Sequence, residues 1–296
     1  MTEADSVEAV IRMLSQSGYY CDDDLAMGVF LAIKLGKPLF LEGEPGVGKT
    51  EMAKVLASSL GRRLIRLQCY EGLDVSTAVY EWNYAKQLLS LKLAGEAGAG
   101  PEHLEDVFGP EYLLSRPLLE AIRSESQGQR VVLLIDELDR ADEEFEAFLL
   151  ELLSDFQVTI PEMGTVASPT IPLVVLTSNR TREIHDAIKR RCLYHWIDYP
   201  SLEKELQIVQ AKVPGIDQRL AQEICQLMRR LRQDDYLKRP GVAESLDWAQ
   251  ALVLLHRDHL DVDIVRQTKS CLFKNRQDLR RFQDGIARYI GGAFEE

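Results

Sequence analysis

No apolar run in the chain approaches the length of about 20 residues that a membrane-spanning helix needs. The five cysteines are scattered through the sequence without C-x-x-C spacing, so neither a zinc site nor a disulfide framework is predicted. The N-terminus is acidic and lacks the basic-then-apolar order of a secretory signal. These absences favour a cytoplasmic protein with reduced thiols and no membrane insertion.

Positive charge is also scarce. The 296 residues include 35 Lys and Arg against 47 Asp and Glu, which gives a formal net charge of −12. Because nucleic-acid binding depends on clustered cations that neutralise phosphates, this balance argues against nucleic acid as the main partner. The length exceeds that of a usual single domain, so we expect two packed units.

The most informative stretch is a complete G-x-x-x-x-G-K-T motif, a P-loop, at residues 43–50. It follows an apolar run from Pro38 to Leu41 that is typical of a strand, and it opens a segment with helical periodicity that ends at Gly61. In this context the glycines let backbone N–H groups turn toward a phosphate at the positive end of a helix. The motif therefore predicts a nucleotide-binding protein.

Single residues of the motif have distinct expected roles. Lys49 can reach the β- and γ-phosphates, and the Thr50 hydroxyl can bind Mg²⁺. ATP is favoured over GTP because no N-K-x-D motif ends a strand; the nearest match, at residues 275–278, lies in a charged C-terminal segment. The residues predicted to bind the nucleotide are Gly43, Glu44, Pro45, Gly46, Val47, Gly48, Lys49, Thr50 and Glu51.

Further apolar runs alternate with helical segments through the first two-thirds of the chain. Candidate strands fall at residues 64–69, 131–135, 171–177 and 193–199. This alternation predicts an α/β P-loop NTPase fold, with a parallel sheet flanked by helices and the ligand at the carboxyl ends of the strands. After Pro200 the pattern is helical only. We expect a nucleotide-binding core over residues 1–200 and a smaller all-helical lid domain over residues 201–296.

An acidic pair, Asp136 and Glu137, ends the apolar run at 131–135 and is expected to face the same crevice as the P-loop. Asp136 can hold Mg²⁺ through water, because Mg²⁺ keeps part of its hydration shell. Glu137 is then free to polarise the water that attacks the γ-phosphate, which favours sustained ATP hydrolysis. The alternative is that Asp136 only caps the helix that follows.

Two further polar positions come after the next candidate strand. The amide of Asn179 can hydrogen-bond the γ-phosphate or the attacking water, although an asparagine can equally turn the chain there. Arg190 and Arg191 precede the last candidate strand. Arginine is suited to stabilising the charge of a transferring phosphoryl group, and no helix face explains this pair. The alternative is that both are solvated charges on a short helix.

Taken together, these features resemble the AAA+ ATPases and, within them, the MoxR family. The matching stretches are residues 41–50, 134–141 and 177–180, together with the two arginines before Cys192. The P-loop alone is generic, whereas the ordered set is specific. Segments 69–74 and 80–84 are similar to those of CoxD-like members. Two insertions of the family also have counterparts, in the aromatic segment 70–93 and in a predicted hairpin at 157–166.

The resemblance implies a role for each residue. Asp136 and Glu137 would be the Walker B pair, Asn179 the sensor-1 residue, and Arg191 an arginine finger that reaches a neighbour's ATP, with Arg190 as the fallback. A finger acting in trans implies a ring, so the resemblance implies a hexamer with ATP and Mg²⁺ between subunits. It further implies a remodelling chaperone with a von Willebrand factor A-domain partner and a metalloenzyme client, similar to carbon monoxide dehydrogenase.

One position departs from the family pattern: Ala243 stands where a sensor-2 arginine is common, and Lys238 or Arg239 is the candidate substitute. Two other functions stay open. A nucleic-acid motor or loader would want a cationic hairpin in the pore, whereas the predicted hairpin has Glu162 and no Lys or Arg. The second alternative function is a nucleotide-gated scaffold that binds ATP with little turnover.

Overall fold

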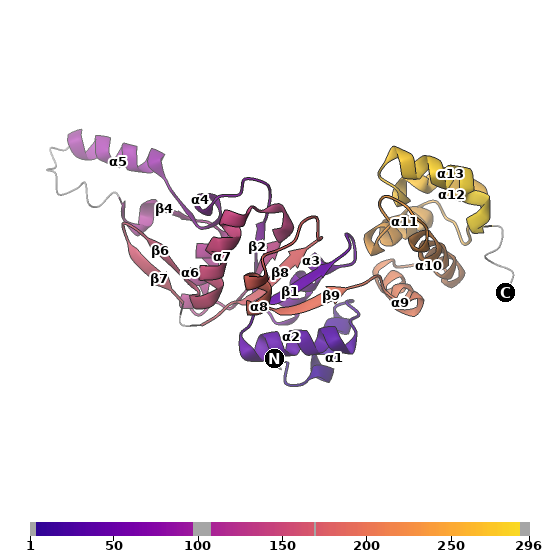
Figure 1. Ribbon diagram of the computed structural model, residues 1–296, viewed down its shortest axis with the longest axis horizontal. Helices are drawn as coiled ribbons and strands as arrows, with labels where there is room; N and C mark the ends of the chain where they lie inside the picture. Colours follow the sequence, from indigo (N-terminus) through magenta and orange to yellow (C-terminus); the bar gives the residue numbers. More distant parts are fainter. Residues whose placement is uncertain (1–3, 97–107, 169, 291–296) are drawn as a thin grey trace. The chain divides into compact units, whose positions relative to one another are not determined.

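The centre of the fold is a five-stranded sheet (Figure 1), seen in a computed structural model that describes residues 4–96, 108–168 and 170–290. The strands stand in the order β2 (Arg63–Gln68), β5 (Val131–Asp136), β8 (Leu173–Ser178), β1 (Leu39–Gly43) and β9 (Leu193–Ile197). The pairs β2–β5, β5–β8 and β8–β1 are parallel. The predicted parallel sheet is confirmed, and the carboxyl ends of these strands lie at one edge.

Burial explains why these segments are strands. Every residue of β5 and of β8 is buried, as expected for central strands that are covered on both faces. Apolar residues of the helices around the sheet, such as Leu119, Phe145 and Ile188, share one core with the strands. The helices that follow or flank the strands are α2 (Asp23–Leu35), α3 (Lys49–Ser59), α6 (Pro117–Ser126), α7 (Glu143–Asp155) and α8 (Asp186–Arg191).

Two small antiparallel pairs are added to this core. Strands β6 (Gln157–Ile160) and β7 (Gly164–Ala167) form the hairpin predicted from the sequence, with Ile160 opposite Gly164. Strand β3 (Tyr80–Trp82) lies within the first insertion, residues 70–93, and pairs with β4 (Leu113–Ser115). Short helical turns flank the second pair at α4 (Val75–Ala78) and η3 (Pro110–Tyr112).

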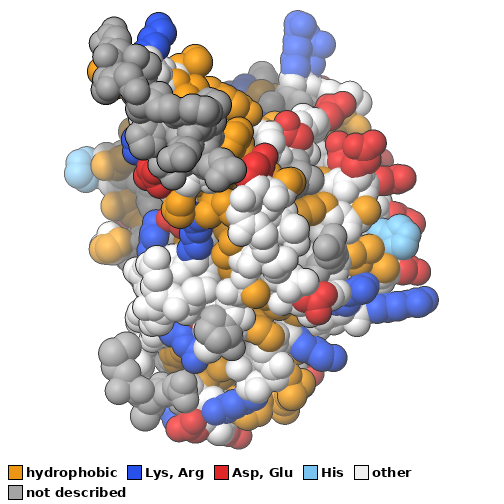
Figure 2. All heavy atoms as spheres, turned by 90° about the vertical axis from the view of Figure 1, so that its left-hand side faces the viewer, with side chains coloured by type: hydrophobic (Ala, Val, Ile, Leu, Met, Phe, Trp, Pro, Cys, Tyr) orange, Lys and Arg blue, Asp and Glu red, His pale blue; other side chains and the backbone are white. Residues whose placement is uncertain are grey.

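Helix α5 (Tyr84–Glu96) presents its apolar side chains to solvent. Tyr84, Leu88, Leu89 and Leu93 are each 58–63% exposed, whereas the polar Gln87 is buried. Figure 1 shows α5 apart from the five-stranded sheet, and Figure 2 views the molecule from that side, where hydrophobic side chains reach the surface. Among the aromatic residues of the first insertion, Tyr70 and Tyr84 are exposed and Trp82 is buried.

Contacts within the chain divide it into two compact units. Unit 1 comprises residues 1–10, 23–42 and 53–195, and unit 2 comprises residues 11–22, 43–52 and 196–296. This division places residues 43–52, which include the P-loop, in unit 2. The assignment of residues 1–200 to a nucleotide-binding core and 201–296 to a lid stays a prediction, and residues 291–296 lie outside the described part of the chain.

Unit 2 is helical after Pro200, as predicted. Its helices start where a side chain accepts from a free backbone N–H: Ser201, Asp217 and Asp261 cap three of them. The helices are α1 (Val7–Gln16), shared with unit 1, and α9 (Leu202–Lys212), α10 (Gln218–Gln233), α11 (Val242–Leu254), α12 (Val262–Leu272) and α13 (Arg276–Ile290). None of the helices in the described ranges is long and apolar enough to cross a membrane.

Candidate nucleotide site

The P-loop has the strand–loop–helix context that the sequence predicts. Strand β1 ends at Gly43 and helix α3 begins at Lys49. Gly46 and Gly48 have φ values of 77° and 101°, in the region that side chains disfavour, so the loop needs glycine at both positions. The predicted nucleotide-binding residues 43–51 thus form one continuous loop and the first turn of α3.

Lys49 is bound to the loop that it is predicted to serve. Its side chain is buried, and Nζ donates to the carbonyl oxygens of Gly43 and Glu44, both at 2.7 Å. Since an ammonium group has three N–H donors, a phosphate can approach by taking the place of one carbonyl. The structure therefore holds the lysine within the loop, where an anion would need it.

Within unit 2 the P-loop contacts the start of α11 through backbone atoms. The N–H groups of Val242 and Ala243 donate to the Gly46 carbonyl oxygen at 3.0 and 3.3 Å. A Cβ atom on Gly241 would lie 2.8 Å from the Pro45 carbonyl oxygen, which is closer than real contacts allow. Ala243, at the position expected for a sensor-2 arginine, therefore meets the loop with its main chain.

A buried arginine supports this contact. Arg232 forms a bidentate ion pair with Glu205 at 2.6 and 2.7 Å and donates from Nε to the Pro240 carbonyl oxygen at 2.8 Å. It thereby fixes the residue that precedes Gly241. The two substitutes suggested from sequence, Lys238 and Arg239, both have exposed side chains. Arg232 was missed because its guanidinium is separated in sequence from everything it contacts.

Asp136 is a buried carboxylate at the end of β5 with both oxygens engaged. Oδ1 accepts from the Thr177 hydroxyl at 2.6 Å, and Oδ2 accepts from Nε and Nη2 of Arg66 at 3.0 and 2.6 Å. The arginine supplies the positive charge that a buried carboxylate needs. The reading of Asp136 as a helix cap is wrong, because Asp142 caps α7 by accepting from the Phe145 N–H.

Glu137 follows in a left-handed conformation, with φ of 55°. Its N–H donates to Thr177 Oγ1 at 2.9 Å, so one threonine joins both acidic residues. The carboxylate accepts from Gln68 Nε2 at 3.0 Å and from Arg140 Nη1 at 3.1 Å, and its side chain is 32% exposed. Glu137 can therefore reach solvent water, which the fully buried Asp136 cannot.

The carboxylates at this edge also affect a neighbouring thiol. Burial, and then the negative charges of Asp136, Asp139 and Glu137, raise the pKa of Cys69 to about 12. The thiol therefore stays protonated at neutral pH, and Cys69 is not suited to nucleophilic chemistry.

Asn179 lies directly after β8, on the same edge of the sheet as Asp136 and Glu137. Its N–H donates to Asp139 Oδ1 at 3.1 Å. Arg190 and Arg191 lie in the last turn of α8, so they belong to a short helix, as in the alternative of solvated charges, although no helix face was expected to explain them. Both are exposed, and Arg191 Nε donates to Ser154 Oγ of α7 at 2.9 Å.

The residues that sequence reasoning missed in unit 1 are the partners of the acidic pair. Arg66 and Gln68 alternate with the buried Ile65 and Leu67 along β2, so the two-residue period of a strand places them together. The register of β2 on β5 then brings them to the acidic pair, since Gln68 lies opposite Asp136. Only the pairing of β2 with β5 reveals which carboxylates they face.

The residues predicted to hold Mg²⁺ fit a hard cation by their chemistry. Thr50 offers a hydroxyl and Asp136 a carboxylate, both of them oxygen ligands. Asp136 is also the acceptor that already attracts a cation, the Arg66 guanidinium. Within the described ranges there is no group of three or more His, Cys, Asp and Glu side chains that could hold a metal ion.

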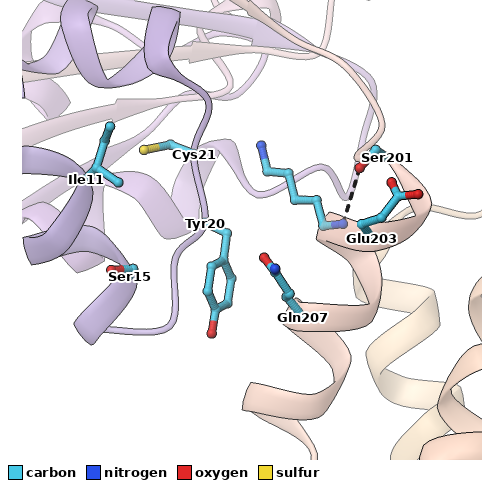
Figure 3. A pocket seen from close by; sticks show the side chains of 8 residues that line it. Ile11, Ser15, Tyr20, Cys21, Ser201, Glu203 and Gln207 are labelled. Atoms are coloured by element: carbon cyan, nitrogen blue, oxygen red, sulfur yellow. Dashed lines mark hydrogen bonds between the residues drawn. The ribbon is translucent and has the colours of Figure 1, made fainter. Parts of the chain in front are cut away.

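A separate hollow of about 390 Å³ lies in unit 2 between the loop after α1 and the first turns of α9. Figure 3 shows Tyr20 and Cys21 on one side of it and Gln207 on the other. Lys204 also lines it; its backbone N–H donates to Ser201 Oγ at 3.2 Å, and its Nζ lies 3.9 Å from Asp22. None of the predicted nucleotide-binding residues lines this hollow.

Comparison with known proteins identifies the family of the chain. The family model of the AAA domain, dynein-related subfamily, matches residues 38–192, more than half of the chain. The chain therefore belongs to this family of P-loop nucleoside triphosphatases. A nucleoside-triphosphatase, THEP1, from Aquifex aeolicus (strain VF5) is 27% identical over 167 residues, which is 51% of this chain and 82% of that protein.

Solved structures show the same fold at low sequence identity. One mutant form of RuvB from Thermotoga maritima has a TM-score of 0.50 and 18% identity, covering 97% of this chain and 79% of that one. A second RuvB mutant has a TM-score of 0.50 and 17% identity, covering 97% and 80%. At this identity the likeness establishes the fold alone. The narrower resemblance to MoxR and CoxD-like proteins stays a prediction.

Proposed function

We propose that the chain is an ATP-hydrolysing remodelling chaperone of the MoxR type. The observation that supports ATP hydrolysis is the pair Asp136 and Glu137, joined through Thr177 at the ends of two adjacent parallel strands; the MoxR type rests on the sequence resemblance. One carboxylate is buried beside a cation, and the other is half-exposed toward water. A buried metal ligand next to a water-activating carboxylate supports hydrolysis rather than binding alone.

The proposed steps assign one task to each group. Lys49 exchanges a loop carbonyl for a phosphate oxygen. Thr50 and Asp136 would hold Mg²⁺, which would supply positive charge to the phosphates. Glu137 leaves Gln68 and Arg140 and orients the attacking water. Asn179 hydrogen-bonds the γ-phosphate or that water.

The arginine finger and the ring belong to the same proposal. Arg191, or Arg190 in its place, would stabilise the transferring phosphoryl group bound by a neighbouring subunit, which is worth about 10³–10⁵ in rate. The exposure of both arginines at the end of α8 supports a role toward another molecule. A hexamer is the assembly we propose, located in the cytoplasm.

The exposed face of α5 supports a partner protein. Tyr84, Leu88, Leu89 and Leu93 lie on one short helix with their side chains in solvent, and a patch of this kind marks an interaction surface. We propose that the client is a metalloenzyme of the carbon monoxide dehydrogenase kind, handled together with a von Willebrand factor A-domain partner.

The test is hydrolysis measured with ATP and with GTP, for the wild type and for Glu137→Gln. We expect turnover with ATP in the wild type and bound but unhydrolysed ATP in the variant. Glu144→Gln, an exposed carboxylate at the start of α7, serves as the matched control. Equal turnover in the wild type and in Glu137→Gln would remove Glu137 from its role.

Subunit mixing tests the shared site. Arg191→Ala subunits keep their own Glu137, and Glu137→Gln subunits keep their own finger, so mixed rings should regain activity that neither variant has alone. Rings that form without regaining activity would count against a finger in trans.

Saturable binding to DNA with a steep salt dependence would instead favour a nucleic-acid motor. ATP binding without turnover would favour a nucleotide-gated scaffold.

A further inference from the structure

The segment between β8 and α8, residues 179–185, contains no helix or strand, yet a single buried carboxylate holds its beginning. Asp139, in η4 (Leu138–Arg140), accepts from the Asn179 N–H at 3.1 Å. It also accepts from the N–H and the hydroxyl of Thr181 at 2.9 and 2.6 Å. Only 3% of Asp139 is exposed. Three donors that converge on one acceptor fix the backbone around Asn179 in one conformation.

A second buried carboxylate holds the end of the same segment. Glu146 of α7 accepts from the His185 N–H at 2.8 Å and forms an ion pair with Arg182. Arg182 also donates from Nε to the Ala141 carbonyl oxygen at 3.0 Å. His185 is the residue that caps the start of α8, so Glu146 fixes where this helix begins.

These contacts are stronger than ordinary loop hydrogen bonds. Burial acts to raise the pKa of Asp139, but the hydrogen bonds from Thr181 and Asn179 outweigh it and hold the pKa below its usual value. The carboxylate is therefore charged at neutral pH. If the donors moved away, a buried charge would lose its partners at a large cost, so segment and carboxylate are expected to move together.

Both carboxylates come from the chain that directly follows Asp136 and Glu137, and the segment they hold leads from Asn179 to the arginines of α8. We propose that Asp139 and Glu146 are positioning residues that couple Asn179 to Arg190 and Arg191. The inference rests on the proposed function, because it concerns the regulation of the same site. A shift of Asn179 caused by the γ-phosphate is passed to α8, so the nucleotide state of one subunit alters the finger that it offers to its neighbour.

Helix α8 is expected to move as a rigid unit when its first turn is displaced. It is only six residues long, and its buried Ile188 anchors it in the core beside α7. At its end Arg191 is bound to Ser154 of α7 and to the Ala187 carbonyl oxygen. A short helix that is fixed at its start by Glu146 and along its length by one side chain has little freedom to absorb a displacement of its first turn.

The experiment uses the full chain with Mg²⁺ and a non-hydrolysable ATP analogue. Amide hydrogen exchange is followed for residues 179–191, together with nucleotide affinity and kcat. The variants are Asp139→Asn, which replaces an acceptor oxygen by a donor, and the milder Thr181→Val, which removes one hydroxyl. Asp142→Ala is the matched control. Asp142 lies between Asp139 and Glu146 in the chain, and its carboxylate caps helix α7 by accepting from the Phe145 N–H.

In the wild type, the analogue should raise the protection of residues 179–181 and of α8 together. In Asp139→Asn and Thr181→Val, nucleotide affinity should stay within about two-fold while kcat falls by about 10-fold or more, as for other supporting contacts of a site. The analogue should no longer protect α8 in these variants. Asp142→Ala should melt earlier but keep both kcat and the protection of α8.

The coupling is overturned if both variants behave like Asp142→Ala, with kcat and α8 protection changed no more than folding stability explains. It is also overturned if the analogue protects residues 179–181 of the wild type without protecting α8. Wild-type protein that binds no nucleotide contradicts the proposed function itself, and that outcome is separate because it appears before any variant is compared.

Discussion

The two regions that carry the predicted site residues are held in place by different kinds of contact. The P-loop is held through its backbone carbonyls: Lys49 Nζ donates to two of them, and the Gly46 carbonyl accepts from backbone N–H groups at the start of α11. The edge of the sheet is held by side chains, with Asp136 on Arg66 and Glu137 on Gln68. One region depends on glycine and main-chain shape, the other on pairs of charged and polar groups.

This difference determines which substitutions each region tolerates. Backbone contacts do not change when a distant side chain is replaced, but they fail when a Cβ atom enters, as at Gly241. A side-chain pair tolerates substitutions at neighbouring positions that keep the backbone conformation. It is lost when one partner is removed, and the remaining buried charge then destabilises the fold. Four predictions test this contrast, beginning with the largest expected effect.

Glu137→Gln should lower ATP turnover by about 10³-fold, within the range for loss of a general base, and leave nucleotide affinity unchanged. The amide keeps the size of the side chain but cannot take a proton from water. Steady-state turnover and equilibrium binding of a fluorescent ATP analogue measure the two effects separately. A parallel loss of affinity and turnover would mean that Glu137 acts on binding instead.

Lys49→Ala should weaken nucleotide binding by about 100-fold, equivalent to about 3 kcal/mol, because a charged donor to the phosphates is lost. Lys54→Ala is the control, since Lys54 is exposed on the same helix α3. Equilibrium binding with each variant gives the comparison. An unchanged affinity for Lys49→Ala would contradict the P-loop assignment.

Gly241→Ala should weaken nucleotide binding by about 10-fold and lower folding stability by about 1–3 kcal/mol, because the new Cβ would overlap the main chain of the P-loop. Gly285→Ala provides the control, as a Cβ there meets nothing closer than Tyr289 Cε2 at 3.5 Å. Urea denaturation and nucleotide binding measure the two losses. If both glycines tolerate alanine equally, the backbone contact between Gly241 and the P-loop is not close.

Arg66→Gln should lower the free energy of unfolding by about 1–2 kcal/mol without nucleotide, since the partner of Asp136 is lost but Arg66 itself is half-exposed. Mg²⁺ with ATP should reduce this difference, because the metal supplies a replacement positive charge. Arg63 lies on the same strand as Arg66 and forms an exposed pair with Glu120 of α6, so Arg63→Gln should change stability by less than about 1 kcal/mol. A loss that Mg²⁺ and ATP leave unchanged would indicate that the metal does not replace Arg66 beside Asp136.

The P-loop could be recognised from sequence because its geometry needs particular residue types in a fixed order. The strands were equally accessible, since β5 and β8 are buried on both faces and appear as continuous apolar runs. Their ends then located Asp136, Glu137 and Asn179. Local pattern was sufficient for these segments, because each signal lies within one continuous run of residues.

The partners of these residues could not be predicted, because they come from segments far away in sequence. Arg66 is seventy positions from Asp136, and Asp139 binds Thr181 across forty-two. Only the register of β2 on β5, and the packing of η4 against the loop after β8, bring them together. Arg232 and Pro240 depend in the same way on the packing of unit 2.

The central claim is that ATP is hydrolysed at a site shared between subunits of a ring. The most direct measurement is the ATPase rate per subunit across a range of protein concentrations, with the mass of the particle determined in parallel with and without ATP and Mg²⁺. The account predicts a rate that rises as a hexamer forms. A constant rate from a monomer would contradict it, because Arg190 and Arg191 would then have no neighbouring site to serve.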